Sequence, residues 1–202
     1  WVLDTVRQVM ALPQFAVRAI NFSAYGASLV YLDANGQPVA PLYNYLKPYP
    51  GDLQRQFSDR YDRSGTLALE TASPALGSLN AGLMLYRLKH RQPARFARVR
   101  VALHLPQYLS YLFTGQPCSD LTSLGCHTLL WDMARGQYHD WVTAEALESR
   151  LAPVVAAHET RPGVAPWPGK PDQPLPVGTG LHDSSAALIP YLAAFDEPFL
   201  LL

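Results

Sequence analysis

The sequence predicts a mixed α/β fold, and three observations point to it. Strand-like segments come first, a block of helical segments comes next, and a strand–helix–strand order ends the chain. The 202 residues are 49% hydrophobic and only 16% charged, which excludes general disorder. A folded chain of this length buries roughly 70% of the surface of its extended form, so it sustains a core without disulfides or metals.

The first segments predict a helix and then two strands. Apolar residues recur at helical spacing over residues 1–12, and Pro13 ends that pattern. Residues 15–23 are rich in β-forming residues and predict a buried strand, and residues 27–32 predict a second one. The Asp33-Ala34-Asn35-Gly36 sequence is a strong turn signal at the end of the second strand.

The middle of the chain is mostly helical in its periodicity. An aromatic stretch over residues 39–45 predicts extended backbone before the helices begin. The predicted helices cover residues 52–60, 75–90, 94–99, 105–113 and 140–151. Gly115 is expected just past the end of the fourth of these helices, and Asp140 is expected to cap the last one.

The last part of the chain predicts a loop and then a strand, a helix and a strand. Prolines crowd residues 161–176, which excludes regular helix and central strand and favours a rigid surface loop. Residues 175–179 predict a short strand, and residues 184–194 predict a helix that contains Pro190. Residues 199–202 predict the start of another strand.

The charge balance limits the partners of this chain. Sixteen Lys and Arg residues equal sixteen Asp and Glu residues, so no overall field attracts nucleic acid or an anionic membrane. The basic segment 89–100 is interpreted as a solvated helix face and loop. No apolar run reaches the ~20 residues of a membrane helix, and no signal peptide is evident, so a cytoplasmic location is expected.

The cysteines and the two ends of the sequence each support one expectation. Cys118 and Cys126 are too few for a disulfide framework, which favours idle thiols in a reducing compartment. The sequence begins at Trp1 within a helical pattern and ends at Leu202 within an apolar run. We therefore expect it to be a piece of a longer protein.

The strongest chemical signal lies near residue 183. A short strand, a glycine-bearing turn and a small-residue helix place Asp183 at a helix start, where ligands of α/β proteins bind. Asp183 can accept the proton of a substrate hydroxyl as a general base, and His182 can donate a hydrogen bond to the same substrate. The alternative, favoured on spacing alone, is that Asp183 caps the helix, where a carboxylate is a weaker base.

Two other stretches carry weaker signals. Residues 21–26 lie at a strand end and combine an amide, a hydroxyl and a phenol, which suits a polar pocket and a plain β-turn about equally. The adjacent Cys126 and His127 lack further ligands for zinc and lack the spatial pairing of a nucleophilic couple. No phosphate loop of either familiar glycine-rich kind occurs in the sequence.

Three segments together resemble the FGGY carbohydrate kinases. Ser23-Ala24-Tyr25-Gly26, with Leu32-Asp33-Ala34-Asn35-Gly36 and Tyr43-Asn44-Tyr45, resembles the early sugar-pocket region of that family. The segment from Leu105 to Gly115 resembles the family's "P-D-Y-L-x-Y-x-L-T-G" helix end, and Asp120, Thr122, Asp132 and Trp141 come after it as they do in the family. Gly180-Leu181-His182-Asp183-Ser184-Ser185-Ala186 resembles the catalytic-base segment, in the His-Asp form of the rhamnulokinase and fuculokinase branch.

The resemblance implies a fold and an activity. The fold is a ribonuclease-H-like domain of the actin and hexokinase type, with residues 1–202 as a portion of the sugar-binding N-terminal domain. The activity is ATP-dependent phosphorylation of a sugar hydroxyl, of a ketose or deoxyketose, with Asp183 as the general base. Ser23, Ala24, Tyr25, Gly26 and His182 are the implied sugar contacts.

The resemblance also implies partners and leaves an alternative. ATP and Mg²⁺ are expected to be held largely outside these residues, the first strands and the ATP-side domain are expected to be missing, and a homodimer is left open. Leu46-Lys47 stands in place of the family's Arg-Asp, Gln107 in place of Asp, and Tyr25 in place of a frequent Trp or Gln. These departures support the alternative of a non-catalytic sugar-binding module with the same fold.

Overall fold

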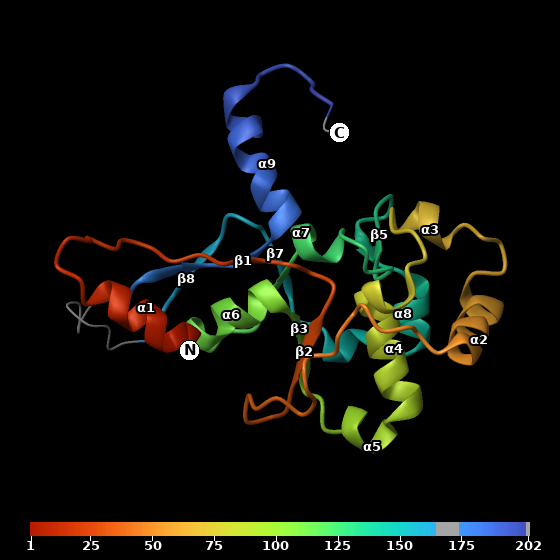
Figure 1. The fold of residues 1–202 in the computed structure, drawn as a ribbon. Helices are drawn as coiled ribbons and strands as arrows, with labels where there is room; N and C mark the ends of the chain where they lie inside the picture. The colour runs from red at the N-terminus through yellow and green to blue at the C-terminus, as the bar shows by residue number, and fades with distance from the viewer. Residues whose placement is uncertain (165–173, 201–202) are drawn as a thin grey trace.

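The computed structural model describes residues 1–164 and 174–200 and confirms a mixed α/β fold (Figure 1). The helices are α1 (Val2–Met10), α2 (Gly51–Tyr61), α3 (Leu67–Glu70), α4 (Ala81–Arg91), α5 (Pro93–Phe96), α6 (Leu105–Thr114), α7 (Leu121–Leu124), α8 (Asp140–Ala144) and α9 (Asp183–Ala194), with 3-10 turns η1 (Gly77–Leu79) and η2 (Glu148–Arg150). The strands are β1 (Ser23–Ala24), β2 (Leu29–Leu32), β3 (Val101–His104), β4 (Ser119–Asp120), β5 (Trp131–Asp132), β6 (Gln137–Tyr138), β7 (Val154–Val155), β8 (Thr160–Pro162), β9 (Pro176–Gly178) and β10 (Leu181–His182).

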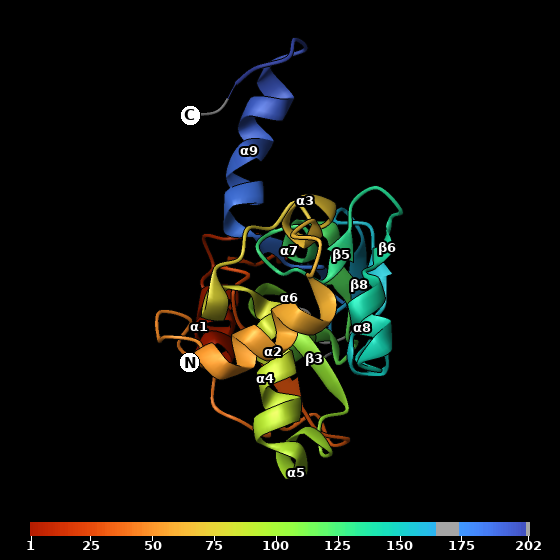
Figure 2. The ribbon, with the colours of Figure 1, turned by 90° about the vertical axis from the view of Figure 1, so that its right-hand side faces the viewer.

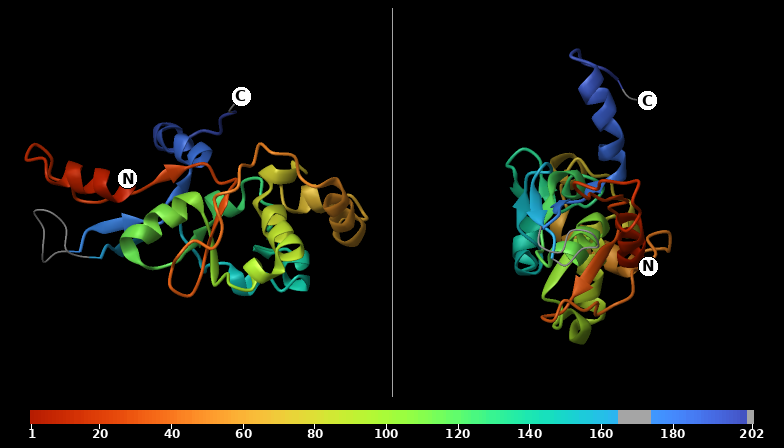
Figure 3. Two further views of the ribbon diagram at one scale, coloured as in Figure 1. Left: turned by 60° about the horizontal axis from the view of Figure 1, so that its bottom comes forward. Right: turned by 90° about the vertical axis from the view of Figure 1, so that its left-hand side faces the viewer.

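The elements form an elongated body with one projecting helix. Helix α1 lies at one end with β8, the strands β2 and β3 lie near the middle with α6, and α2, α4 and α8 lie at the other end (Figure 1 and the left view of Figure 3). Helix α9 stands away from this body in Figure 1, in Figure 2 and in the right view of Figure 3. No residue of α9 is buried.

In the described residues the paired strands are short, and both parallel and antiparallel pairs occur. The longest pair is antiparallel, between β2 and β3, with Leu29 opposite His104. Strands β1 and β10 pair in parallel, as do β4 and β7. Strands β5 and β6, and β8 and β9, pair antiparallel. Strand β3 was not predicted, because four residues between two helices carry no periodic signal of their own.

The predicted strand over residues 15–23 is wrong along most of its length. Only Ser23 belongs to a named strand, and Ile20 makes a single parallel bridge to Val177. Phe15 is 54% exposed rather than buried. The segment has β-forming residues, but a strand also needs a partner alongside it, and this one finds a partner only toward its end.

Local signals in the sequence predicted several elements correctly. The amphipathic α1 ends ahead of Pro13, and α6 ends at Gly115 in the left-handed conformation. The turn after β2 is held by Asp33 Oδ1, which accepts hydrogen bonds from the backbone N–H groups of Asn35 and Gln37. The aromatic stretch over residues 39–45 is extended or turn-like and contains no strand.

Other element boundaries correct the predictions. The helix expected from residue 75 begins at Ala81 after η1, and α8 stops at Ala144. His139, not Asp140, is the N-cap of α8, and its Nδ1 accepts a hydrogen bond from the N–H of Trp141. Residues 199–200 form no strand, and residues 201–202 lie outside the described residues.

The proline-rich segment is only partly a loop. Its two ends pair as β8 and β9, with Pro162 opposite Pro176. Proline is tolerated there because both strands are short and Pro lacks only the N–H donor. Residues 165–173, the middle of the expected loop, lie outside the described residues.

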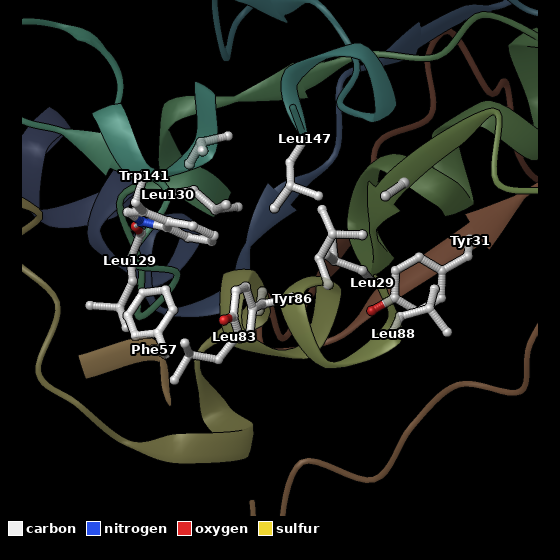
Figure 4. Close-up of a cluster of buried hydrophobic side chains, with 14 of the residues drawn as sticks. Leu29, Tyr31, Phe57, Leu83, Tyr86, Leu88, Leu129, Leu130, Trp141 and Leu147 are labelled. Atoms are coloured by element: carbon white, nitrogen blue, oxygen red, sulfur yellow. Dashed lines mark hydrogen bonds between the residues drawn. The ribbon is translucent and has the colours of Figure 1, made fainter. Parts of the chain in front are cut away.

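The main core gathers around α4 between α2, α8 and β2 (Figure 4). Phe57, Tyr86 and Trp141 meet edge to face, with ring centroids 5.0 Å apart for Phe57 and Trp141 and 5.2 Å apart for Phe57 and Tyr86. Leu83, Leu129 and Leu130 lie beside these rings, and Leu88 and Leu147 extend the same cluster toward Tyr31 and Leu29 (Figure 4). Such aromatic pairs add about 0.5–1.5 kcal/mol beyond their buried area, so they stabilise the packing of α2, α4 and α8.

A buried carboxylate changes the interpretation of the basic segment. Glu145, 2% exposed, lies within 2.6 Å of Lys89 Nζ and 3.0 Å of His90 Nε2, and Tyr61 Oη donates to its other oxygen. Two residues expected on a solvated face therefore point into the core region. Arg98 and Arg100 are exposed, as predicted.

Candidate functional site

Parallel pairing of β1 with β10 brings residues 23–26, the predicted sugar loop, beside residues 180–186, the predicted base segment. Ser23 lies opposite Leu181, and Ala24 lies opposite His182. The backbone of Gly26 then passes so close to the His182 ring that a Cβ on it would lie 2.6 Å from Cδ2. Two segments far apart in the sequence thus form one site at the start of α9.

Asp183 is the first residue of α9, and its side chain is 53% exposed. Its Oδ1 accepts a hydrogen bond of 2.7 Å from the N–H of Ser184. The N-cap position belongs to His182, which makes no side-chain capping bond. Asp183 is therefore not the N-cap residue, but its carboxylate does accept a backbone N–H of the first helical turn, as the capping alternative requires, and the helix N-terminus favours its negative charge.

His182 is 6% exposed, and its ring packs against Gly26 through the Cδ2–Nε2 edge. Burial lowers its pKa, and the nearby carboxylate of Asp183 opposes that lowering only in part. Nδ1 lies 3.4 Å from Asp183 Oδ1 without a hydrogen bond between them. The ring is thus a neutral, fixed group beside the exposed carboxylate.

Gln107 supports the site through buried hydrogen bonds, and the sequence analysis assigned it no functional role. This fully buried amide donates through Nε2 to Asp120 Oδ1 at 2.8 Å and to the carbonyl oxygen of Gly180 at 2.7 Å. Its Oε1 accepts a hydrogen bond of 3.0 Å from Ser123 Oγ. Gln107 thus links α6, α7 and the turn that leads into β10.

Asp120 extends this network to His182. Its carboxylate caps α7 by accepting from the N–H groups of Thr122 and Ser123, and it also accepts from Thr122 Oγ1 at 2.6 Å. Thr122 Oγ1 in turn accepts a hydrogen bond of 3.0 Å from the N–H of His182. The only signal for this network in the sequence was the acidic residue and threonine that come after the helix end.

The turn itself requires glycine. Gly180 has φ +82, and a Cβ there would collide with the carbonyl oxygen of Pro106. The close approach of the turn to α6 is what lets Gln107 reach the Gly180 carbonyl. Asn21 closes the other side, because its Oδ1 accepts a hydrogen bond from the N–H of Gly180 at 3.0 Å.

One aromatic ring of the sugar loop, Tyr25, packs against a second tyrosine. The rings of Tyr25 and Tyr45 are 5.4 Å apart between centroids. Tyr45 also lines a cavity of about 450 Å³ together with Lys47, Tyr49, Gln54 and residues 75–79. Aromatic faces beside polar side chains suit a hydroxyl-rich ligand.

The cysteines contribute no reactive group. Cys118 and Cys126 are free, and burial raises the pKa of both thiols, which disfavours the reactive thiolate. Within residues 1–164 and 174–200, no group of three His, Cys, Asp or Glu side chains is arranged to hold a metal ion.

None of the helices in the described residues has the length and apolar character needed to cross a membrane. Among curated protein sequences, none matches this chain.

Solved structures similar to this chain include sugar and glycerol kinases. A carbohydrate kinase from Novosphingobium aromaticivorans superposes with a TM-score of 0.80 at 30% identity, over 94% of this chain and 40% of that one. A xylulose kinase from Rhodospirillum rubrum gives 0.76 at 19% identity, over 92% and 39%. The glycerol kinase of Plasmodium falciparum with ADP gives 0.75 at 14% identity, over 93% and 40%. The chain thus spans about two fifths of the length of these proteins.

The family model described as the N-terminal domain of the FGGY family of carbohydrate kinases matches residues 2–190. The structural relatives also fit the mixed α/β fold, which is consistent with the actin- and hexokinase-like ATPases. From residue 2 to within α9, this chain belongs to the FGGY family of carbohydrate kinases and forms its N-terminal domain.

Proposed function

We propose that this chain forms the sugar-binding side of an ATP-dependent carbohydrate kinase, with Asp183 as the general base. One observation carries the proposal: the β1–β10 pairing sets Ser23–Gly26 beside a half-exposed carboxylate at a helix N-terminus. The proposed sugar contacts are Ser23, Ala24, Tyr25, Gly26 and His182.

The proposed chemistry is a single displacement. Asp183 accepts the proton of the sugar hydroxyl while the hydroxyl oxygen forms a bond to the γ-phosphorus of ATP. The bond from that phosphorus to the bridging oxygen breaks, and ADP leaves with the electron pair. A base that is exposed and fixed in position suffices, because positioning and charge stabilisation supply most of the rate in such transfers.

We propose that ATP and Mg²⁺ are held largely by polypeptide outside these 202 residues. This chain covers 40% of the carbohydrate kinase from Novosphingobium aromaticivorans, so most of such an enzyme lies outside it. A cytoplasmic location and a homodimer stay predictions.

A ketose or deoxyketose is the proposed substrate class. The His182-Asp183 pair in the form of the rhamnulokinase and fuculokinase branch supports it. The structurally similar kinases are named for xylulose, gluconate and glycerol, so the panel of acceptors to test must include ketoses, sugar acids and polyols.

A non-catalytic sugar-binding module is the second candidate. The departures at Leu46-Lys47 and Gln107 favour it. The amide of Gln107, however, is fully hydrogen-bonded and supports the turn into β10, so that departure leaves the site intact. This favours the catalytic proposal.

The test is a coupled assay of ADP release by the full-length protein over that acceptor panel. We expect one acceptor class to stimulate ADP release, and Asp183→Asn to reduce kcat by at least about 100-fold, as loss of a general base does. Asp196→Asn, an exposed carboxylate beyond α9, is the matched control and should retain activity. If Asp183→Asn is as active as the wild type, the proposal fails; sugar binding without turnover in calorimetry would favour the second candidate.

A further inference from the structure

A cavity next to the sugar loop carries polar groups that the proposed function does not use. It has a volume of about 450 Å³ and is lined by residues 45–49, by Gln54 of α2 and by residues 75–79. The ring of Tyr45 in its wall lies 5.4 Å from the ring of Tyr25 in the sugar loop, between centroids. Small-molecule sites have volumes of about 300–1,000 Å³, so this cavity is large enough for a ligand of the size of a sugar.

Among the described residues, Lys47 is the one charged side chain in the wall of this cavity. It is exposed, and its ammonium has neither an ion-pair partner nor a hydrogen-bond partner in residues 1–164 and 174–200. The carboxylate of Asp52 on α2 is paired with Arg91 and does not line the cavity. The cavity therefore presents an uncompensated positive charge, which favours an anionic group in the ligand.

Ser78 has a hydroxyl group without a partner in the described part of the chain. The residue lines the cavity and is 3% exposed, and its Oγ is buried without a hydrogen bond. Such an atom requires an explanation, because nearly all buried polar atoms in folded proteins are paired. A ligand in the cavity supplies the missing acceptor, since rotation about the Cα–Cβ bond gives the hydroxyl two other staggered positions. The amide of the half-buried Gln54 likewise has no side-chain partner among the residues described.

The wall that carries Ser78 is fixed before any ligand binds. The fully buried Asn80 accepts a hydrogen bond of 2.6 Å from the N–H of Leu76, and its Nδ2 donates to two backbone carbonyl oxygens at 3.0 Å. Tyr49 is fixed by its Oη, which donates to the carbonyl oxygen of Leu83 at 2.9 Å. A preformed wall favours binding, because little conformational entropy is lost when the ligand enters.

We propose that this cavity binds a polyhydroxy carboxylate, that is, a sugar acid. Lys47 pairs with the carboxylate, and the hydroxyl of Ser78 and the amide of Gln54 donate hydrogen bonds to it. One lysine is a point charge that matches the single charge of a carboxylate, whereas arginines bind phosphate bidentately and none lines the described wall. Such a site goes beyond the proposed function, because binding there does not require Asp183 to act as a base.

Calorimetric titration of the full-length protein with gluconate, without ATP, tests this inference. The neutral analogue glucitol has the same carbon chain without the carboxylate, and we expect it to bind at least about tenfold more weakly. Lys47→Gln should weaken gluconate binding about tenfold and remove the preference over glucitol. Arg98→Gln, at an exposed cation outside the cavity, is the matched control and should bind gluconate as the wild type does.

Ser78→Ala provides a second variant with its own readout. It should weaken gluconate binding about fivefold. It should leave the unfolding midpoint unchanged, because Oγ makes no hydrogen bond in the free protein. This variant and the comparison of gluconate with glucitol on the wild type decide the matter even if Lys47→Gln does not fold.

Equal affinities for gluconate and glucitol would overturn the inference, as would wild-type gluconate affinity in a folded Lys47→Gln variant. Tighter binding of inorganic phosphate than of gluconate would also overturn it. The turnover of Asp183→Asn tests the proposed function, whereas binding without ATP tests this cavity. The two failures are therefore distinguishable.

Discussion

The side chain of Gln107 shows how one buried amide can organise a site from a distance. Its Nε2 donates hydrogen bonds to Asp120 and Gly180, and its Oε1 accepts one from Ser123. A carboxyl group at this position would lose both donors and face the carboxylate of Asp120. The amide is therefore required by its acceptors and not merely tolerated.

Gln107→Glu should for this reason lower the free energy of unfolding by about 3 kcal/mol or more, since it removes the hydrogen bonds to Asp120 and Gly180 and buries a second negative charge beside Asp120. Urea unfolding at pH 7 measures the change. Gln14→Glu, at an exposed position, is the control and should stay within about 0.5 kcal/mol of the wild type. A loss for Gln107→Glu no larger than the control's would show that the amide network contributes nothing.

Gly180 permits a second comparison at the same scale. Gly180→Ala combines a left-handed backbone with a collision against Pro106, whereas Gly136→Ala has a similar φ of +64 and open space around it. We expect Gly136→Ala to cost about 1 kcal/mol and Gly180→Ala to cost at least about 2 kcal/mol more. If urea unfolding shows equal decreases in the free energy of unfolding for the two variants, the close approach of Gly180 to α6 imposes no steric constraint.

At the scale of elements, Glu145 joins α8 to α2 and α4. Burial alone would raise the pKa of Glu145, but hydrogen bonds from Lys89, Tyr61 and His90 outweigh it and lower the pKa. A carboxyl with a lowered pKa contributes stability above its unfolded pKa, about 4.3, and loses that contribution as pH falls through the folded value. The packing of these three helices is thus sensitive to acid.

Glu145→Gln should cost about 3 kcal/mol at pH 7, because it leaves the Lys89 ammonium without its carboxylate. The difference from the wild type should shrink as the pH is lowered below about 4, where the wild type also loses its charge. Denaturant unfolding at several pH values measures this, with the exposed Glu197→Gln as the control. A difference that does not change with pH would contradict the assignment.

Helix α9 differs from α4 in what it packs against. Seven residues of α4 are buried and none of α9 is. Hydrogen exchange measured by mass spectrometry should therefore show the backbone amides of α9 exchanging at least ~100-fold faster than those of α4. Comparable protection of the two helices would show that α9 has a partner in solution.

At the scale of the whole molecule, the zero net charge and the exposed apolar area both favour self-association. The formal net charge is zero, and Ile189, Leu192 and Phe195 of the α9 region are each more than half exposed. We expect concentration-dependent association near pH 7 that weakens at about pH 9, where net charge returns. Light scattering measures it. Leu192→Lys should reduce association more than Leu46→Lys, an exposed leucine outside α9; equal effects would exclude α9 as the contact.

The elements that the sequence predicted correctly carry their signals locally. Helices α1 and α6 have apolar periodicity with Pro13 and Gly115 at their ends, and the turn after β2 has its own aspartate. Strand β3 was missed because its existence depends on pairing with β2, far away in the sequence. The role of Gln107 was missed for the same reason, since Gly180 lies 73 positions away. Family resemblance supplied the site residues, and the β1–β10 pairing showed why they are neighbours.

That pairing also has a consequence for biosynthesis. Ser23–Ala24 leaves the ribosome well before its partner Leu181–His182 is synthesised. At ordinary elongation rates the delay is roughly ten to thirty seconds. Until then the sugar loop has no strand to pair with, while the helices around Trp141 are already complete. The nascent chain therefore acquires its stable core before it acquires its site.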